Sequence, residues 1–187
     1  MSVTVKFELS DRDVEHFVAM AREAQQVVAG GDEQAIVAGA RKLFDAARSA
    51  ELPDFISSRL EKLGELADML TDSEWQLSGE NRQRVLSALA YFSNPEDLIP
   101  DRVPGIGFLD DAIMAELVVQ ELDAEITAYR EFCGYRRAEE KRRASEGLPT
   151  DVKREDWLAD KRAVLHHRMR ERRLTSSSTG GWRVRLW

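Results

Sequence analysis

At 187 residues, with 43% apolar and 33% charged side chains, the chain is long enough for one globular domain with a substantial core and a heavily solvated surface. Its single cysteine, Cys133, excludes an internal disulfide. No stretch approaches the roughly 18 uncharged apolar residues of a membrane span, and the first residues lack a signal-peptide pattern, so we expect a cytoplasmic protein with no membrane span.

Both ends of the chain alternate apolar and polar residues, as a half-buried β-strand does. A lone strand leaves its backbone groups unpaired, so we predict that residues 3–9 and 182–186 pair as antiparallel strands. The same pairing between two copies of the chain would give a homodimer.

Between these ends, apolar residues recur at helical spacing. The predicted helices start near Ser10, Asp32, Pro53 and Val85, and two more cover about residues 110–137 and 152–173. The last of these has only a thin apolar line, so we expect it to dock on something rather than to join the core. The predicted fold class is mainly α, a bundle of about five or six helices with a small two-stranded β element from the chain termini.

The net charge of −7 is unevenly distributed. Residues 136–187 hold 15 Lys and Arg against 8 Asp and Glu, whereas residues 1–135 hold 12 against 26. This predicts an acidic helical domain over 1–135 and a basic C-terminal segment over 136–187, with one helix and a terminal strand. The basic segment either folds back on its own acidic body or contacts nucleic acid or a membrane surface.

The stretch YFSNPEDLIPDRVPGIGFLDD, residues 91–111, which we call the connector, joins the fourth helix to the fifth. Asn94 and Pro95 suit the start of a short helical turn, and Pro100 would stop it. Asp110 and Asp111 fall in the first turn of the next helix, where the helix dipole favours negative charge. Local structure therefore explains most of the connector.

The connector also resembles the signature of the YkvA-like family, a bacterial domain of unknown function. The pattern is Y-F-x-x-P-x-D-L-I-P-D-x-x-P-x-x-G-x-x-D-D, and it belongs to a region of resemblance over about residues 83–125. The positions we single out as a motif or binding surface are Tyr91, Pro95, Asp97, Asp101, Pro104, Gly107, Asp110 and Asp111. The resemblance implies a small helical domain and no established reaction.

Four aspartates of the connector suggest a site for a hard cation. Carboxylate oxygens are the ligands that Mg²⁺, Mn²⁺ and Ca²⁺ accept, and clustered carboxylates repel each other unless a cation or an arginine lies nearby. The candidate ligands are Asp97, Asp101, Asp110 and Asp111. The spacing is not that of an EF-hand, and helix caps or salt bridges account for the same residues.

The basic segment mixes arginine with tryptophan, a combination that can bind single-stranded nucleic acid through phosphate contacts and stacking. The candidate residues are Arg170, Arg172, Arg173, Arg183 and Arg185. The acidic body and the interspersed acidic residues oppose such binding.

No pattern in the sequence indicates a reaction. His166 and His167 are adjacent and would point about 100° apart on a helix, so they do not form a two-ligand face. Cys133 continues an apolar stripe and is predicted to be a buried thiol. The sequence therefore favours a non-enzymatic cytoplasmic interaction or scaffold domain that presents a rigid acidic loop to another protein. The alternatives are a divalent-metal-dependent hydrolase that uses the aspartates, and nucleic-acid binding through the basic tail.

Overall fold

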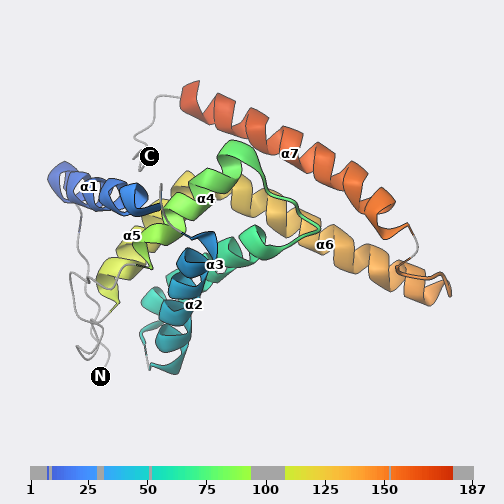
Figure 1. Ribbon diagram of the computed structural model, residues 1–187, viewed down its shortest axis with the longest axis horizontal. Helices are drawn as coiled ribbons and strands as arrows, with labels where there is room; N and C mark the ends of the chain where they lie inside the picture. The colour runs from blue at the N-terminus through green and yellow to red at the C-terminus, as the bar shows by residue number, and fades with distance from the viewer. Residues whose placement is uncertain are drawn as a thin grey trace.

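The computed structural model describes residues 8, 10–28, 32–50, 52–93, 108–151 and 153–178. Over these residues the protein is mainly α, with seven helices and no strand (Figure 1). The helices are α1 (Asp11–Val28), α2 (Glu33–Ser49), α3 (Asp54–Thr71), α4 (Gly79–Tyr91), α5 (Leu109–Glu121), α6 (Asp123–Ser145) and α7 (Arg154–Ser178). None of the described helices is long and apolar enough to cross a membrane.

The count of five or six helices is wrong, because the helix expected over 110–137 is divided into α5 and α6. The strands expected at residues 3–9 and 182–186 fall almost wholly outside the described residues. Glu8, the one described member of the pair, is not in a strand, so the two-stranded element has no support.

The division between α5 and α6 lies at Leu122, whose φ and ψ are −102° and 19°. Its N–H donates to Val118 O at 2.9 Å, and its own carbonyl accepts from Ile126 N at 2.9 Å. The Leu122 side chain is fully buried, so packing holds the bend in place. Because the sequence has no proline or glycine here and its apolar stripe continues, nothing in the sequence predicted the break.

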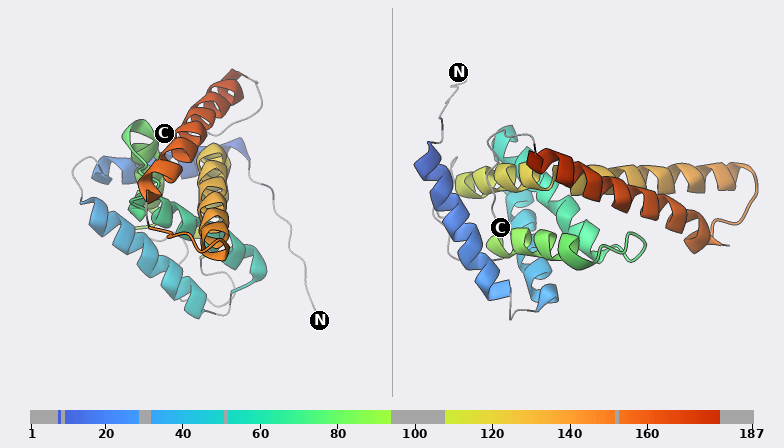
Figure 2. Two further views of the ribbon diagram at one scale, coloured as in Figure 1. Left: turned by 90° about the vertical axis from the view of Figure 1, so that its right-hand side faces the viewer. Right: turned by 90° about the horizontal axis from the view of Figure 1, so that it is seen from above.

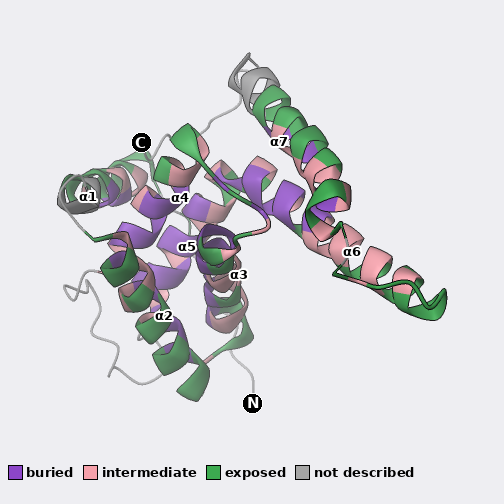
Figure 3. Ribbon diagram, turned by 45° about the vertical axis from the view of Figure 1, so that its right-hand side comes forward, coloured by how far each residue is buried: buried purple, intermediate pink, exposed green. Residues whose placement is uncertain are grey.

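Most of the core lies among the first five helices and the first half of α6, where the buried residues gather in Figure 3. Helix α7 adds Leu158, Leu165 and Met169 to it. Helix α3 is central, because it packs against α2, α4, α5 and α6. Its buried face consists of Ile56, Leu60, Leu63, Leu66, Ala67, Met69 and Leu70. The start of α2 follows the prediction, since the side chain of Asp32 accepts a hydrogen bond from Gln34 N at 2.9 Å.

Helices α6 and α7 form a hairpin that extends away from the rest of the bundle (Figures 1 and 2). Two residues with positive φ, Gly147 and Lys153, lie in the reversal between the two helices. Helix α7 is the helix predicted over about 152–173, and its apolar residues Leu158, Leu165 and Met169 are buried. The division of the chain at residue 135 stays a prediction, and α6 runs through this point without a break.

One glycine marks a close approach between α2 and the end of α4. A Cβ atom built on Gly39 would lie 2.8 Å from Cβ of Ser93, a distance that side chains do not adopt without movement. A Cβ built on Gly134, in the middle of α6, would meet nothing within 4 Å. The two glycines therefore form a matched pair for substitution.

We expect Gly39→Ala to lower the free energy of unfolding by about 1–3 kcal/mol, because α2 must move away from Ser93. Gly134→Ala should instead raise it by about 0.5–1 kcal/mol, since alanine is the better helix former and the space is open. Urea denaturation followed by circular dichroism measures both values. Equal effects of the same sign would contradict the close approach at Gly39.

Candidate functional site

Both ends of the connector are fixed to the core by aromatic side chains. Phe92, just after α4, is 3% exposed, and Phe108, just before α5, is 4% exposed. Tyr91 is partly buried, and its ring meets that of Phe92 edge to face at 5.1 Å. Phe108 has a φ of 65°, a left-handed conformation that turns the chain directly into α5.

Asp110 and Asp111 occupy the first turn of α5, as the sequence predicted. Both side chains are buried, at 3% and 5% exposure. An exposed acidic surface on the connector therefore depends on its other carboxylates, Glu96, Asp97 and Asp101. Five of the predicted site residues, Pro95, Asp97, Asp101, Pro104 and Gly107, lie outside the described residues.

The structure brings no complete metal site together from the part of the chain that it describes. Within those residues, no group of three or more His, Cys, Asp or Glu side chains is arranged to hold a cation. Only two of the four predicted ligands, Asp110 and Asp111, are among them. The proposed cation site therefore stays a prediction.

The predicted nucleic-acid residues are only partly described. Arg170 and Arg172 are exposed on α7, and Arg173 lies in the same helix. Arg183 and Arg185 are outside the described residues. Three other arginines of α7 are already engaged in ion pairs, Arg154 with Glu74 and Glu140, Arg162 with Glu155, and Arg168 with Glu131. These pairs reduce the positive charge that α7 could offer to phosphates.

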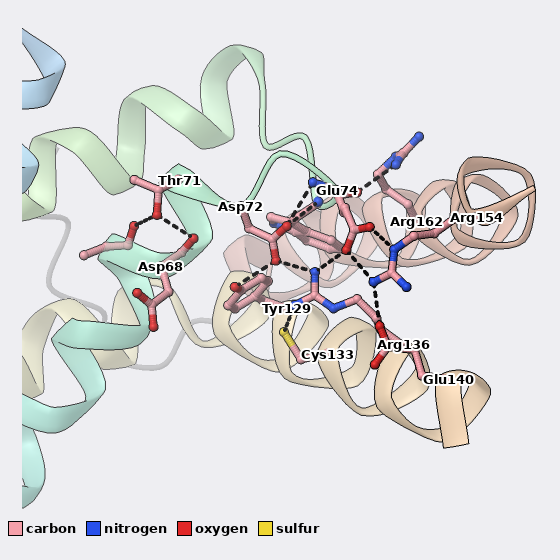
Figure 4. Close-up of polar contacts among 12 residues, drawn as sticks. Asp68, Thr71, Asp72, Glu74, Tyr129, Cys133, Arg136, Glu140, Arg154 and Arg162 are labelled. Atoms are coloured by element: carbon pink, nitrogen blue, oxygen red, sulfur yellow. Dashed lines mark hydrogen bonds and ion pairs between the residues drawn. The ribbon is translucent and has the colours of Figure 1, made fainter. Parts of the chain in front are cut away.

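A polar cluster that the sequence analysis missed joins the loop between α3 and α4, residues 72–78, to α6 and α7 (Figure 4). Asp72 is its first member. One carboxylate oxygen, Oδ1, accepts from the backbone N–H groups of Glu74 at 2.9 Å and Trp75 at 3.2 Å, which fixes the turn. The other, Oδ2, accepts from the hydroxyl of Tyr129 at 3.1 Å and from Nη1 of Arg136 at 2.9 Å.

Glu74 is the second member and connects the loop to both helices of the hairpin. Its carboxylate accepts from Arg136 of α6 at 2.8 Å and from Nη2 of Arg154 of α7 at 3.0 Å, and its backbone carbonyl accepts from Arg162 at 2.7 Å. The hydrogen bond from Arg154 lowers the pKa of Glu74, and Arg136 adds to this effect against the opposing effect of partial burial. Glu74 therefore stays ionised in mildly acidic solution.

Tyr129 is held as a neutral phenol at this junction. Burial raises the pKa of Tyr129 above its ordinary value, and the nearby groups Cys133 and Asp72 raise the pKa further. Cys133 is half-buried, and its sulfur accepts a contact from Arg136 Nη2 at 3.6 Å. The cluster therefore engages its carboxylates with arginine and tyrosine donors, which suits docking of the hairpin rather than proton transfer.

The aromatic centre of the cluster is Trp75, which is fully buried. Its ring lies 5.7 Å from that of Tyr129, 5.1 Å from that of Phe132 and 4.3 Å from that of His166. Three elements therefore meet on one indole: the loop, α6 and α7. The sequence signal for this anchor was a tryptophan in an otherwise polar stretch, three residues after the aspartate that caps the turn.

A second polar contact crosses the region where α4, α5 and α6 meet. Arg84 of α4 lies 3.2 Å from Glu121 and 3.4 Å from Glu125, and all three side chains are largely or fully buried. A buried charge is stable only when it is paired, so this contact fixes α4 relative to the start of α6.

A groove of about 280 Å³ lies between α2 and α3, next to a cavity of about 160 Å³ that shares part of its lining. Charged residues of both signs line the larger one, including Arg41, Asp68 and Glu65. Arg41 donates to Asp68 at 3.1 Å and Arg130 donates to Glu65 at 2.6 Å. No residue of the predicted site lines either hollow.

Comparison with known proteins gives one match. A model of the family described as "Protein of unknown function (DUF1232)" matches residues 84–117, which span most of α4, the connector and the first part of α5. No curated protein and no solved structure matches the chain. The match supports a known domain of unknown function over this stretch. It brings no activity, and neither the YkvA-like name nor the pattern written above follows from it.

Proposed function

We propose that this protein is a non-enzymatic interaction module that binds another protein through the central residues of the connector, 94–107. The observation that carries the proposal is the fixing of both connector ends, by Phe92 at 3% and Phe108 at 4% exposure. A segment whose two ends are already fixed has less conformational entropy to lose on binding than a free segment, which favours recognition of a partner.

The negative charge of the connector indicates which class of protein surface it would bind. The connector carries Glu96, Asp97 and Asp101 between its anchors, on a body whose residues 1–135 are strongly acidic. With Asp110 and Asp111 buried, we assign the partner-facing charge to Asp97 and Asp101. The expected partner is a basic protein surface in the cytoplasm, bound with a strong dependence on salt concentration.

Site-specific photocrosslinking tests this proposal. A photoreactive amino acid at Val103, within the connector, should crosslink a protein in extracts of the native host, and the same group at Lys42, exposed on α2, should not. The double substitution Asp97→Asn and Asp101→Asn should reduce the Val103 crosslink at least several-fold while leaving the melting temperature within a few degrees. Equal crosslinking from both positions, or an undiminished crosslink in the double variant, would refute the proposal.

Thermal melting with added divalent cations separates this function from a divalent-metal-dependent hydrolase. If the aspartates serve as helix caps and partner contacts, millimolar Mg²⁺, Mn²⁺ or Ca²⁺ should leave the melting temperature unchanged. A rise of several degrees that is lost in Asp101→Asn would replace the interaction function with a metal site, because a ligand that binds only the folded state stabilises it.

A further inference from the structure

His166 of α7 is placed where its neutral form packs well and its charged form does not. Its ring meets the ring of the fully buried Trp75 edge to face, with centroids 4.3 Å apart and planes at 88°. Nε2 of His166 is enclosed, and among the described residues it has no hydrogen-bond partner. The imidazole therefore acts as an aromatic packing group between α7 and the α3–α4 loop.

Among the described residues, the charged groups that act on His166 are arginines rather than a counter-ion. Burial is the main cause that lowers the pKa of His166, and Arg162 and Arg170, one turn away on each side, lower the pKa further. A contact with the backbone of Trp75 opposes this shift without cancelling it. The other titratable or charged groups of the cluster on the packed elements are Asp72 and Glu74 of the loop and Tyr129, Cys133 and Arg136 of α6. Both carboxylates already accept hydrogen bonds from arginine.

We propose that α7 is an acid-releasable latch: protonation of His166 separates α7 from the α3–α4 loop and α6, while the bundle of α1–α5 stays folded. The undocked helix exposes His166 to water, so the undocked state binds the proton more readily than the docked state. Docking is therefore fully stable above the ordinary histidine pKa of about 6.5 and is weakened as pH falls below it. Release exposes the aromatic face formed by Trp75 and Phe132.

Two glutamates that pair with arginines of α7 do not respond over the same pH range. The pKa of Glu74 is lowered by Arg154, and the pKa of Glu155 is lowered by Arg162. Both carboxylates therefore stay ionised at pH 5, and the pH response of docking depends on the imidazole.

Amide hydrogen exchange on the full chain, corrected for intrinsic exchange rates, tests the latch. Between pH 7 and pH 5 we expect the protection of Leu165 and Met169 in α7 to fall by roughly three-fold or more, since each unit of pKa difference changes the equilibrium tenfold. Protection of Leu63 and Leu66 in α3 should stay constant. Unchanged protection of α7, or an equal loss in α3, would overturn the proposal.

Two histidine variants test whether His166 causes the loss of α7 protection at low pH. His166→Phe keeps an aromatic ring without a titrating nitrogen and should abolish the pH response of α7. His167→Phe is the matched control, because His167 is exposed and pairs with Glu171 at 3.4 Å, and it should keep the full response. If His166→Phe does not fold, NMR titration of His166 in the wild-type protein measures its pKa directly and tests the proposal. A His166 pKa at or above 6.5 would contradict the latch, and a lower value that accompanies loss of α7 protection would support it.

Discussion

Replacing Trp75 with alanine is expected to lower the free energy of unfolding by about 3–5 kcal/mol, among the largest effects of any single substitution in this chain. The indole is fully buried and contacts aromatic rings from two helices, including Phe132 at 5.1 Å and His166 at 4.3 Å. Its removal leaves a cavity at the place where the loop, α6 and α7 meet. Urea denaturation followed by circular dichroism measures the change.

Trp157 provides the matched control for this substitution. It is also on the interface between α6 and α7, but it is only partly buried, and its ring faces the guanidinium groups of Arg143 and Arg154 at 5.2 and 5.3 Å. Trp157→Ala should cost about 1–2 kcal/mol, because less apolar surface is lost. If both tryptophans cost the same, Trp75 is not the anchor of the hairpin.

The helical part of the fold could be predicted from the sequence, because its signals are local. Asp32 accepts a hydrogen bond from Gln34 N at the start of α2, as a cap in the sequence suggested, and the thin apolar line of α7 is buried. The bend at Leu122 could not be predicted, since both sides keep helical hydrogen bonds and the apolar spacing continues through it. The packing of the buried Leu122 side chain holds the bend between α5 and α6, and the spacing of apolar residues in the sequence does not reveal it.

The sequence placed the candidate site in the connector and did not predict the Asp72 and Glu74 cluster. Asp110 and Asp111 were expected at a helix start, and they are there, but sequence reasoning foresaw neither their burial nor the left-handed turn at Phe108. The Asp72 and Glu74 cluster was missed because its arginine partners lie 62 to 88 positions later in the chain. Pairing over such distances depends on how α6 and α7 pack against the α3–α4 loop, which no local pattern encodes.

Replacing Asp72 with alanine should lower the free energy of unfolding by about 3–5 kcal/mol. Its side chain is 10% exposed, and its loss removes four hydrogen bonds at once, two from the backbone of the α3–α4 loop and two from Tyr129 and Arg136. Arg136 keeps Glu74 as a partner, but the Tyr129 hydroxyl and the loop N–H groups lose theirs in a largely buried place. A cost below about 1 kcal/mol would mean that water replaces the carboxylate without difficulty.

Asp68, one turn earlier on α3, is the matched control. It is 65% exposed and pairs with Arg41 at 3.1 Å, so Asp68→Ala should cost less than about 1 kcal/mol. A double substitution then tests the mechanism at Asp72. If the cost of Asp72→Ala comes from donors left without a partner, adding Tyr129→Phe removes one of those donors, and the double variant should be more stable than the sum of the two single effects predicts. Strict additivity would mean that Tyr129 and Asp72 stabilise the junction independently, and the hydrogen bond between them would then not be what holds α6 to the loop.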